Sequence, residues 1–375
     1  MYREVAVTPI EAGYRKFLPA ETAVQYLDPV GHPTASTARY CRPDDARLTE
    51  MYRKMVLGRR FDRQATALTK QGRLAVYPSS RGQEACQIAV AMSLHAEDWL
   101  FPTYRDSMAL VARGIDPVEV LAMLAGDWHC CYQPVAHRTA PQCTPLATQL
   151  VHAVGLAYGQ ARKGAGVAVL ALCGDGATSE GDFHEALNFA AVLRAPVIFL
   201  VQNNGFAISV PFARQSVAPS LAHKGVGYGI GSEQVDGNDP LAMLAVMDEA
   251  RSYVLAGNGP VIVEALTYRL EGHTNADDPT RYRTSNEVTQ WGARDPIARL
   301  ENYLRAAGLI DETGVDAIAA EAEDLAAAVR DGMNAKRPID PDDLFRYVFA
   351  EPTPQLRAQQ AQAHAELDAD DGWQP

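Results

Sequence analysis

The segment from Gly174 to Ser209 constrains the fold more than any other part of this sequence. It contains an apolar run that ends at Gly174-Asp175-Gly176, then an amphipathic stretch, then a second apolar run that ends at Asn203-Asn204. Roughly thirty positions separate Asp175 from Asn204, which is the length of a strand, a helix and a second, parallel strand. We therefore predict a β-α-β unit that brings both side chains to one edge of a parallel sheet.

A glycine turn with a carboxylate and an amide beside it indicates a phosphate site built around a cation. Open parallel sheets bind ligands beyond the carboxyl ends of their strands, and the N-terminus of the helix that follows favours anions. Asp175 adds a negative charge where a phosphate would sit, so we expect a divalent cation between the two. Mg²⁺ takes carboxylate, phosphate and water oxygens, and Asn204 with a backbone carbonyl of its turn can complete the set.

Three other interpretations of the glycine turn compete with a metal–phosphate site. A dinucleotide fingerprint needs GxGxxG, whereas the next glycine after Gly176 is Gly181, which is too late. A nucleotide P-loop needs a Gly-Lys-Ser/Thr ending, and this turn has no lysine. The third is an ordinary turn that uses glycine for its conformational freedom, which would suffice for a lone GDG. The polar residues at both ends of the unit favour the metal–phosphate site over it.

Composition and charge exclude several classes of protein. A hydrophobic fraction of 47% with 21% charged residues is typical of a globular protein, and a formal net charge of −12 argues against nucleic acid or an anionic membrane as partner. We find no apolar stretch as long as a membrane span and no signal peptide at the N-terminus. Six cysteines without a CxxC pair favour reduced thiols in a cytoplasmic protein. Cys130-Cys131 beside His129 lacks the usual spacing of zinc ligands.

Periodicity divides the chain into three parts. Residues 1–45 are expected to form an extended arm, residues 46–335 an α/β domain with a parallel sheet flanked by helices, and residues 336–375 a peripheral C-terminal segment. Ser179 is expected to cap the helix of the β-α-β unit. Further helices are expected at 46–70, 83–94, 149–162, 240–256 and 295–333, a third strand at 260–266, and loops at 127–146 and 269–287. The second loop is long for a connection in a compact domain, which indicates a functional role.

Several motifs extend the glycine turn into a resemblance to a known family. GDG followed about thirty residues later by NN resembles the thiamine diphosphate fingerprint. The matching segments are QGRLAVYPSSRGQEA (71–85), LFPTYRD (100–106), TPLATQLVHAVG (144–155), GYGIGSEQVDGNDP (227–240), EALTYRLEGHTNADDPTRYR (264–283) and DPIARLENYL (295–304). From about residue 20 to 360 the chain resembles the alpha subunit of the thiamine diphosphate-dependent component of a 2-oxo acid dehydrogenase complex. TPLATQ, GYGI with VDGND, and LRAQQ are most similar to the branched-chain (2-oxoisovalerate) type, while QGRLAVY and DDPTRYR are shared with the pyruvate type.

The resemblance implies a thiamine diphosphate-binding fold and a set of magnesium ligands. These are Asp175, Asn204 and the backbone carbonyl of Phe206, which stands where the family usually has tyrosine. A carbonyl ligand survives that change, whereas any role for a hydroxyl group is lost. The other residues that the resemblance places at the cofactor are Thr144, Gly174, Gly176 and Ala177.

The resemblance also assigns residues at the diphosphate. Tyr104 and Arg105 match the pair that contacts it, and the fork of a guanidinium group fits phosphate oxygens. His273 matches a histidine beside the diphosphate and the substrate entry, where it is expected to take part in catalysis. A lone histidine in a polar loop is otherwise most simply a solvated side chain.

A possible potassium site and the polar loop complete these assignments. Thr144, Thr148 and Gln149 match a stretch that holds a structural K⁺ in branched-chain enzymes, and Thr144 is equally suited to capping a helix ahead of Pro145. Cys143 replaces a serine there, which a backbone-oxygen ligand would tolerate. In the loop, Thr274 and Thr284 match phosphoserines of mammalian relatives and are expected to be plain loop residues. Arg281 and Arg283 are expected to order the loop through Asp277 and Asp278.

The chain is expected to hold only half of an active site. Thiamine diphosphate works as a carbanion, whose formation requires a glutamate at the pyrimidine ring, normally supplied by a second domain. With 375 residues and one such β-α-β unit, we expect a beta subunit to supply that half in an α2β2 heterotetramer. The implied activity is oxidative decarboxylation of a 2-oxo acid with acyl transfer to a lipoyl domain of the acyltransferase core. A pyruvate or acetoin dehydrogenase alpha subunit and a non-catalytic scaffold of the same fold stay open as alternatives.

Overall fold

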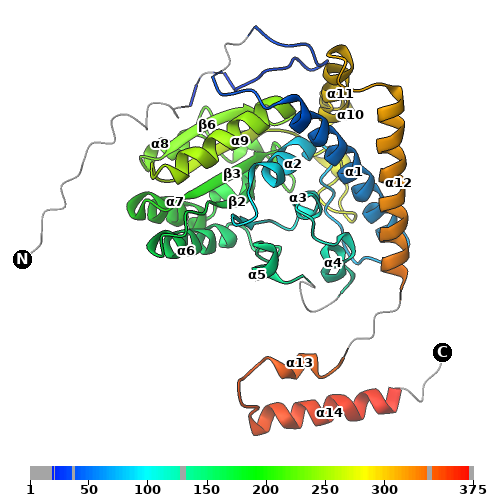
Figure 1. Cartoon of the computed structure of the whole chain (residues 1–375). Helices are drawn as coiled ribbons and strands as arrows, with labels where there is room; N and C mark the ends of the chain where they lie inside the picture. The colour runs from blue at the N-terminus through cyan, green and yellow to red at the C-terminus, as the bar shows by residue number, and fades with distance from the viewer. Residues whose placement is uncertain (1–18, 21, 36–38, 127–131, 336–339, 371–375) are drawn as a thin grey trace, which may run out of the picture. The chain divides into compact units, whose positions relative to one another are not determined.

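Five strands form a parallel sheet at the centre of the larger of two units. The computed structural model describes residues 19–20, 22–35, 39–126, 132–335 and 340–370, and the chain divides into the units Met1–Met333 and Asn334–Pro375. In order across the sheet, the strands are β1 (Trp99–Phe101), β2 (Val169–Gly174), β3 (Val197–Asn203), β7 (Val261–Leu266) and β6 (Gly231–Asp236) (Figure 1). All neighbouring pairs run parallel, so all five strands end at the same edge.

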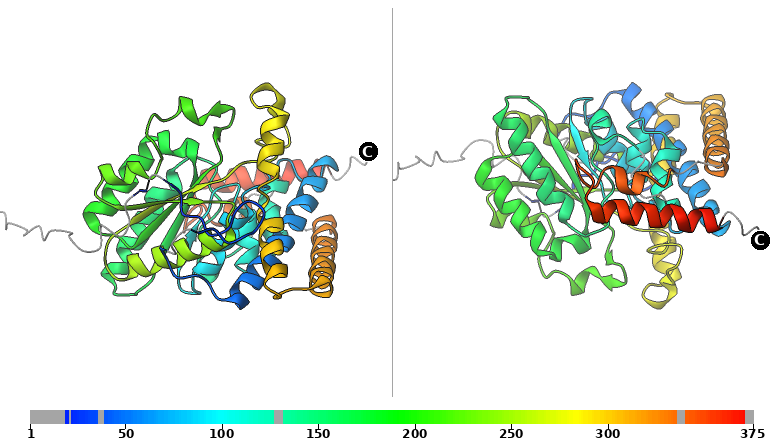
Figure 2. Two further views of the ribbon diagram at one scale, coloured as in Figure 1. Left: turned by 90° about the horizontal axis from the view of Figure 1, so that it is seen from above. Right: turned by 90° about the horizontal axis from the view of Figure 1, so that it is seen from below.

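Alternate residues of each strand enter two different cores. Leu170 and Leu172 of β2 belong to one buried cluster, whereas Val169, Ala171 and Cys173 belong to the other. Successive side chains of a strand point to opposite faces, so this division means that helices cover both faces. One face is covered by α1 (Asp45–Lys70), α2 (Glu84–Ser93) and α9 (Pro240–Leu255), and the other by α6 (Thr148–Arg162) and α7 (Gly181–Leu193) (Figures 1 and 2).

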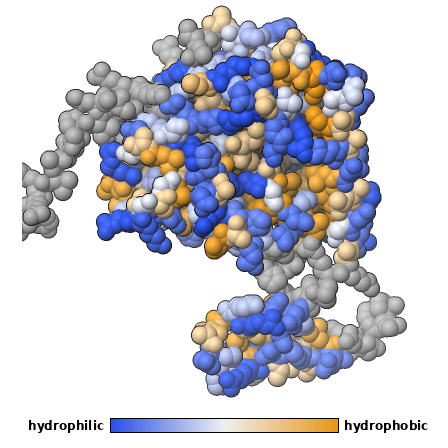
Figure 3. Space-filling model, in the orientation of Figure 1, coloured by the Kyte–Doolittle hydropathy of each residue, from blue (hydrophilic) through white to orange (hydrophobic). Residues whose placement is uncertain are grey.

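Further elements surround this three-layered arrangement. The larger unit also contains α3 (Ser107–Ala112), α4 (Pro117–Ala122), α5 (Pro134–His137), α8 (His223–Gly227), α10 (Ser285–Gly292), α11 (Pro296–Ala306), α12 (Glu312–Asn334) and the hairpin β4 (Phe206–Ala207) and β5 (Val210–Pro211). The smaller unit contains α13 (Asp343–Arg346) and α14 (Pro354–Asp370). The face of the larger unit shown in Figure 3 mixes hydrophilic and hydrophobic residues. Within the described ranges no helix is both long and apolar enough to cross a membrane, and the expected cytoplasmic location stays a prediction.

The structure confirms the predicted β-α-β unit. Strands β2 and β3 are parallel neighbours with α7 between them in sequence. The other predicted helices and the third strand also lie within a few residues of their expected positions. Sequence reasoning missed the two edge strands: β1 has only three residues, and β6 carries Glu233 and Gln234 where an apolar run would have been recognised. The short helix α5 lies in the expected loop at 127–146, and residues 129–131 fall outside the described residues.

One predicted helix cap was wrong, and the structure also excludes a second cap that the sequence had left open as an alternative. Ser179 ends a 3₁₀ turn that begins at Asp175, and α7 starts only at Gly181 with Glu180 in the cap position. The Thr178 hydroxyl donates to the Asp175 carbonyl at 2.8 Å, so the chain completes this tight turn before the α-helix can begin. Thr144 is not a cap either, because Ala147 holds that position in α6 with a left-handed φ of 64°.

A buried arginine ties α11 to the β6 edge and to the N-terminal segment. Both terminal nitrogens of Arg299 donate to Asp236 Oδ2 at 3.0 Å, and one also donates to the Leu27 carbonyl. Asp239 Oδ2 lies 3.7 Å from the same guanidinium group and accepts hydrogen bonds from the backbone N–H groups of Tyr26 and Leu27. Removing the arginine would leave a buried carboxylate without its counter-charge.

We predict that Arg299→Met lowers the free energy of unfolding by about 3 kcal/mol, because breaking a buried ion pair strands the remaining charge. Urea denaturation followed by circular dichroism measures this change. Arg305→Met is the matched control, since Arg305 pairs with Glu301 on the surface, where ion pairs add little. Equal loss of stability in the two variants would contradict the prediction.

Candidate active site

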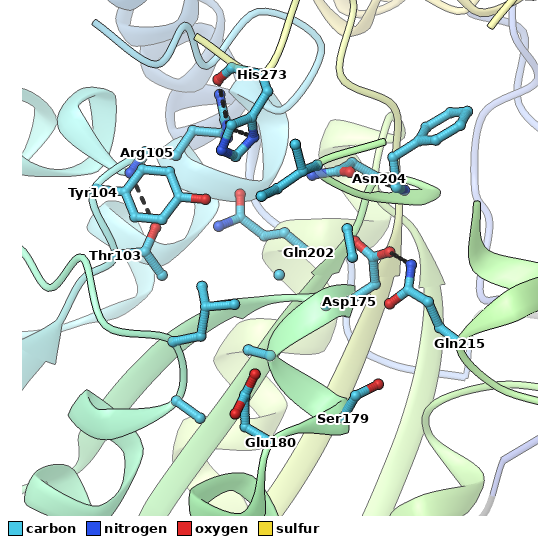
Figure 4. Close-up of a pocket in the computed structure, with 18 of the residues that line it drawn as sticks. Thr103, Tyr104, Arg105, Asp175, Ser179, Glu180, Gln202, Asn204, Gln215 and His273 are labelled. Atoms are coloured by element: carbon cyan, nitrogen blue, oxygen red, sulfur yellow. Dashed lines mark hydrogen bonds between the residues drawn. The ribbon is translucent and has the colours of Figure 1, made fainter. Parts of the chain in front are cut away.

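The residues that follow four of the strands line one cavity of about 420 Å³. Arg105 follows β1, Asp175 follows β2, Asn204 follows β3, and His273 lies in the loop after β7 (Figure 4). Carboxyl ends of parallel strands are the usual ligand site of such sheets. Of the residues predicted from the sequence, those that line the cavity are Tyr104, Arg105, Gln149, Gly174, Asp175, Gly176, Ala177, Asn204, Phe206 and His273.

Two predicted residues lie outside this lining. Thr144 is exposed, and the Thr148 hydroxyl lies 3.4 Å from Asp182 Oδ2 at the start of α6. Gln149 donates from Nε2 to the Leu172 carbonyl at 2.7 Å, while its buried Oε1 has no hydrogen-bond partner. Thr144 is thus not itself a lining residue, although its neighbours Cys143 and Pro145 are. Gln149 keeps one free oxygen.

One carboxylate oxygen of Asp175 accepts a hydrogen bond from the protein, and the other has no partner. The side chain is 1% exposed, and its Oδ2 accepts a hydrogen bond from Gln215 Nε2 at 2.8 Å. Its Oδ1 is buried without a hydrogen-bond partner. Burial raises the pKa of this carboxyl group, against the opposing effect of the Gln215 hydrogen bond. A buried carboxylate oxygen without a partner is costly, so the site fits a cation at Oδ1.

A chain of amide hydrogen bonds orients Asn204. Its Nδ2 donates to Gln83 Oε1 at 3.3 Å, Gln83 Nε2 donates to Gln202 Oε1 at 2.9 Å, and Gln202 Nε2 donates to Asp106 Oδ1 at 2.7 Å. Asp106 is fully buried and can only accept when ionised, so it fixes the direction of the whole chain. The amide nitrogen of Asn204 is thereby engaged. Its Oδ1 accepts from the Phe206 N–H at 3.3 Å and has a second lone pair that a metal ion could use.

Glycine is required at one position of the turn after β2. A Cβ atom at Gly176 would lie 2.7 Å from Ala207 Cβ, which is closer than real Cβ atoms approach. The turn therefore packs directly against the hairpin strand β4. At Gly174 an added Cβ would meet nothing within 4 Å, and this residue lines the cavity, so open space lies beside its backbone.

Two arginines flank His273 on the other side of the cavity. Arg105 donates to the Ser79 carbonyl at 2.8 Å and to the His273 carbonyl at 2.9 Å. Nδ1 of His273 lies 3.2 Å from Arg105 Nη2 and 3.3 Å from Arg269 Nη1. Because arginine can only donate, Nδ1 must accept, which leaves the imidazole proton on Nε2. Burial, and then the charges of Arg105 and Arg269, lower the pKa of His273 to about 4.

These two arginines carry positive charge that no carboxylate balances at close range. Neither Arg105 nor Arg269 forms an ion pair within 4.0 Å in the described part of the chain, although both are at least 94% buried. Uncompensated buried charge is unfavourable, and guanidinium groups bind phosphate oxygens well. With the free carboxylate oxygen of Asp175 opposite, the cavity suits a polyanion that carries a metal ion.

Four residues of this arrangement were missed from the sequence. Gln202 directly precedes Asn203-Asn204 and Arg269 lies four residues before His273, so both positions were a usable signal, whereas Gln83 was marked only by its place in the matching segment 71–85. Gln215 follows a hairpin that no periodicity predicts, and the sequence gives no hint of its contact with Asp175.

The contacts predicted to order the 269–287 loop were wrong, because Arg283 does not pair with Asp277 or Asp278. Arg283 donates to the carbonyls of Arg269, Leu270 and Glu271 rather than to a carboxylate. Asp277 accepts from the His273 backbone N–H at 2.7 Å and from the Tyr282 hydroxyl. The loop turns its carbonyl groups inward after β7, and a long side chain with several donors satisfies them. Thr284, expected as a plain loop residue, caps α10 by accepting from the Glu287 N–H.

The fold and cavity define a parallel α/β protein with a polar cavity at the carboxyl ends of its strands. The profile of the family described as dehydrogenase E1 component matches residues 52–338. The chain is 45% identical over 344 residues to the 3-methyl-2-oxobutanoate dehydrogenase subunit alpha of Mycobacterium tuberculosis, which covers 92% of this chain and 94% of that protein. It is 37% identical to the pyruvate dehydrogenase E1 component subunit alpha of Staphylococcus epidermidis, over 78% of this chain and 80% of the relative.

The chain belongs to the dehydrogenase E1 component family, as the alpha subunit of a 2-oxo acid dehydrogenase. It is therefore an oxidoreductase of the thiamine diphosphate-dependent class. Membership implies thiamine diphosphate and Mg²⁺ as cofactors and a beta subunit as partner within the complex.

We predict that His273 titrates near pH 4 and is neutral at neutral pH, because burial and two cations disfavour its charged form. Arg105→Met removes one of these cations and should raise the pKa of His273 toward its ordinary value. Asp277→Asn is a control of opposite sign, since the Asp277 charge raises this pKa. NMR titration of isotope-labelled histidine measures the pKa of His273 in the wild type and in both variants. A pKa that does not differ between wild type and Arg105→Met would contradict the charge assignment.

Proposed function

We propose that this chain is the alpha subunit of a branched-chain 2-oxo acid dehydrogenase and holds the diphosphate end of thiamine diphosphate in the cavity. The proposal rests on the presence of a carboxylate and two guanidinium groups in the lining of one cavity, none of them balanced by an opposite charge within 4.0 Å among the residues that the structure describes. Asp175 Oδ1 has no partner, and Arg105 and Arg269 have no carboxylate within 4.0 Å in the described ranges. A diphosphate with Mg²⁺ satisfies both sides at once, because the metal takes the carboxylate and the phosphates take the arginines.

The metal would be held by three oxygen donors of this chain. These are Asp175 Oδ1, Asn204 Oδ1 and the carbonyl of Phe206, a set that suits Mg²⁺ and leaves positions for phosphate and water oxygens. The centroid of the Phe206 ring lies 5.4 Å from that of the Tyr282 ring, so the ring would hold the hairpin in place while the backbone carbonyl would supply the metal ligand. This division explains why phenylalanine suffices here in place of tyrosine.

The diphosphate would be held by Tyr104, Arg105 and the backbone of the turn from Gly174 to Ala177. Arg269 adds a second guanidinium group on the same side. When bound, thiamine diphosphate supplies the nucleophilic carbon that attacks the 2-oxo acid and permits loss of CO₂. His273 is neutral and carries its proton on Nε2, so it can donate a hydrogen bond to a phosphate or substrate oxygen without adding a third positive charge.

The remaining parts of the reaction belong to partners. The beta subunit, in an α2β2 heterotetramer, would supply the pyrimidine half of the site, and a lipoyl domain of the acyltransferase core would accept the acyl group. Leu146 and Ile208 line the cavity and are 43% and 56% exposed. Exposed apolar side chains at the edge of a polar cavity suit the apolar rings of the cofactor or a partner surface.

Two finer assignments stay predictions. The 45% identity to the 3-methyl-2-oxobutanoate dehydrogenase subunit, against 37% to the pyruvate dehydrogenase subunit, supports branched-chain 2-oxo acids as substrates. Pyruvate is the alternative. A K⁺ ion near Thr148 and Gln149 is supported only by the unpartnered Gln149 Oε1, and Thr144 is too exposed to add to it.

We predict that Asp175→Asn, co-expressed with the beta subunit, lowers the affinity for thiamine diphosphate in the presence of Mg²⁺ by at least ~100-fold, because the metal loses its single charged protein ligand. Isothermal titration calorimetry measures the affinity. Glu180→Gln is the control, since Glu180 also lines the cavity but is exposed. Unchanged binding by Asp175→Asn would refute the metal assignment, and absence of binding by the wild-type complex would favour a scaffold role.

The assembled complex is expected to act on 3-methyl-2-oxobutanoate with a kcat/KM at least ~10-fold above that for pyruvate, since extra methyl groups in an apolar pocket are worth about this factor. Steady-state assays with an artificial electron acceptor measure both substrates. The alpha chain alone should be inactive in the same assay. A preference for pyruvate would transfer the assignment to the pyruvate type.

A further inference from the structure

Gln215 contacts the proposed metal ligand Asp175 from a different segment of the chain. Its Nε2 donates to Asp175 Oδ2 at 2.8 Å (Figure 4). The same nitrogen donates to the Val210 carbonyl at 3.1 Å. Both donors of the amide are therefore used. The carboxylate of Asp175 is fixed through Oδ2, and this leaves Oδ1 as its unpartnered oxygen.

The hairpin that precedes Gln215 begins directly after Asn204, at the end of β3. Strands β4 and β5 pair Phe206 with Pro211, and the Phe212 N–H donates to the Gly205 carbonyl at 2.9 Å. The N–H of Gln215 then donates to the Phe212 carbonyl at 2.8 Å. The hairpin thus leaves the sheet beside Asn204 and returns Gln215 to Asp175, which links the two turns that carry the metal ligands.

Gln215 also has a free oxygen beside the cavity. Its Oε1 is buried and has no hydrogen-bond partner, as is also the case for Asp175 Oδ1 and Gln149 Oε1 in the lining of the same cavity. It lies 4.0 Å from the position that a Cβ atom of Gly176 would take, and Gln215 lines the cavity. A buried amide oxygen needs a donor, and the described residues offer none.

We propose that Gln215 is a positioning residue for the metal ion, holding Asp175 with its amide nitrogen and accepting from a metal-bound water with its amide oxygen. Mg²⁺ gives up its water slowly and usually keeps some of it when bound to protein. Partners behind the ligands orient them and commonly contribute 10–100-fold to metal affinity. The inference rests on the proposed function, because it needs a metal ion at Asp175.

The test uses the complex of the alpha and beta chains with Gln215→Leu, which removes both the donor and the acceptor at similar volume. The Mg²⁺ concentration for half-maximal activity should rise by about 10–100-fold. Mn²⁺ is the spectroscopic probe. The EPR spectrum of Mn²⁺ bound with thiamine diphosphate should change in the variant, because a ligand and a water are held differently.

Gln234→Leu is the matched control. Gln234 is a half-buried glutamine on β6 whose Nε2 donates to the buried carboxylate of Glu264 at 3.0 Å, and it does not line the cavity. It should change the melting temperature of the complex but neither the Mg²⁺ requirement nor the Mn²⁺ spectrum.

The proposal is overturned if Gln215→Leu keeps the wild-type Mg²⁺ requirement and Mn²⁺ spectrum, or if Gln234→Leu alters them equally. These outcomes are separate from failure of the proposed function. If the proposed function is wrong, the wild-type complex itself will bind neither Mn²⁺ nor thiamine diphosphate. The wild type would then give no EPR signal of bound Mn²⁺ with which the variants could be compared.

Discussion

The hydrogen-bond register of the parallel sheet is the constraint on which the rest of the site depends. Gly174 pairs with Gln202, and Asn203 pairs with Leu266, so the residues after three adjacent strands leave the sheet at one level. A shift by one residue would turn every side chain to the opposite face. Because both faces are packed with apolar side chains, such a shift is costly, and the apolar core thereby fixes the position of Asp175 and Asn204.

This rigid edge allows the molecule to carry charges that it does not neutralise internally. Arg105 is held by the Ser79 carbonyl, and Ser79 and Ser80 are in turn held by Asp62, a buried carboxylate of α1. Burial raises the pKa of Asp62 to about 6, so keeping this carboxylate ionised inside the protein costs free energy. A bound anion would offset the free-energy cost of these buried charges, since a ligand that binds only the folded state adds to its stability.

The central β-α-β unit and its ligands could be predicted from sequence because they depend on local patterns. Apolar runs that end just before Asp175 and Asn204 predict strands. The spacing of these residues predicts that both strands end at the same edge of a parallel sheet. Contacts such as Gln215 with Asp175 depend on the path of a hairpin, and those of Arg283 depend on which carbonyl groups a loop leaves unsatisfied. Strand β6 was missed for a related reason, because its Glu233 is neutralised by Arg39, far away in sequence.

The cavity contains groups for holding an anion and a metal, but it lacks an obvious base for the chemistry. Among the described residues that line it, the carboxylates are Asp175 and Glu180. Asp175 is committed to Gln215 and, in our proposal, to the metal, while Glu180 is exposed at the start of α7. A general base needs a fixed position and a suitable pKa, and neither carboxylate combines the two. The carboxylates that line this cavity therefore serve binding, which agrees with our proposal that the beta subunit supplies the other half of the site.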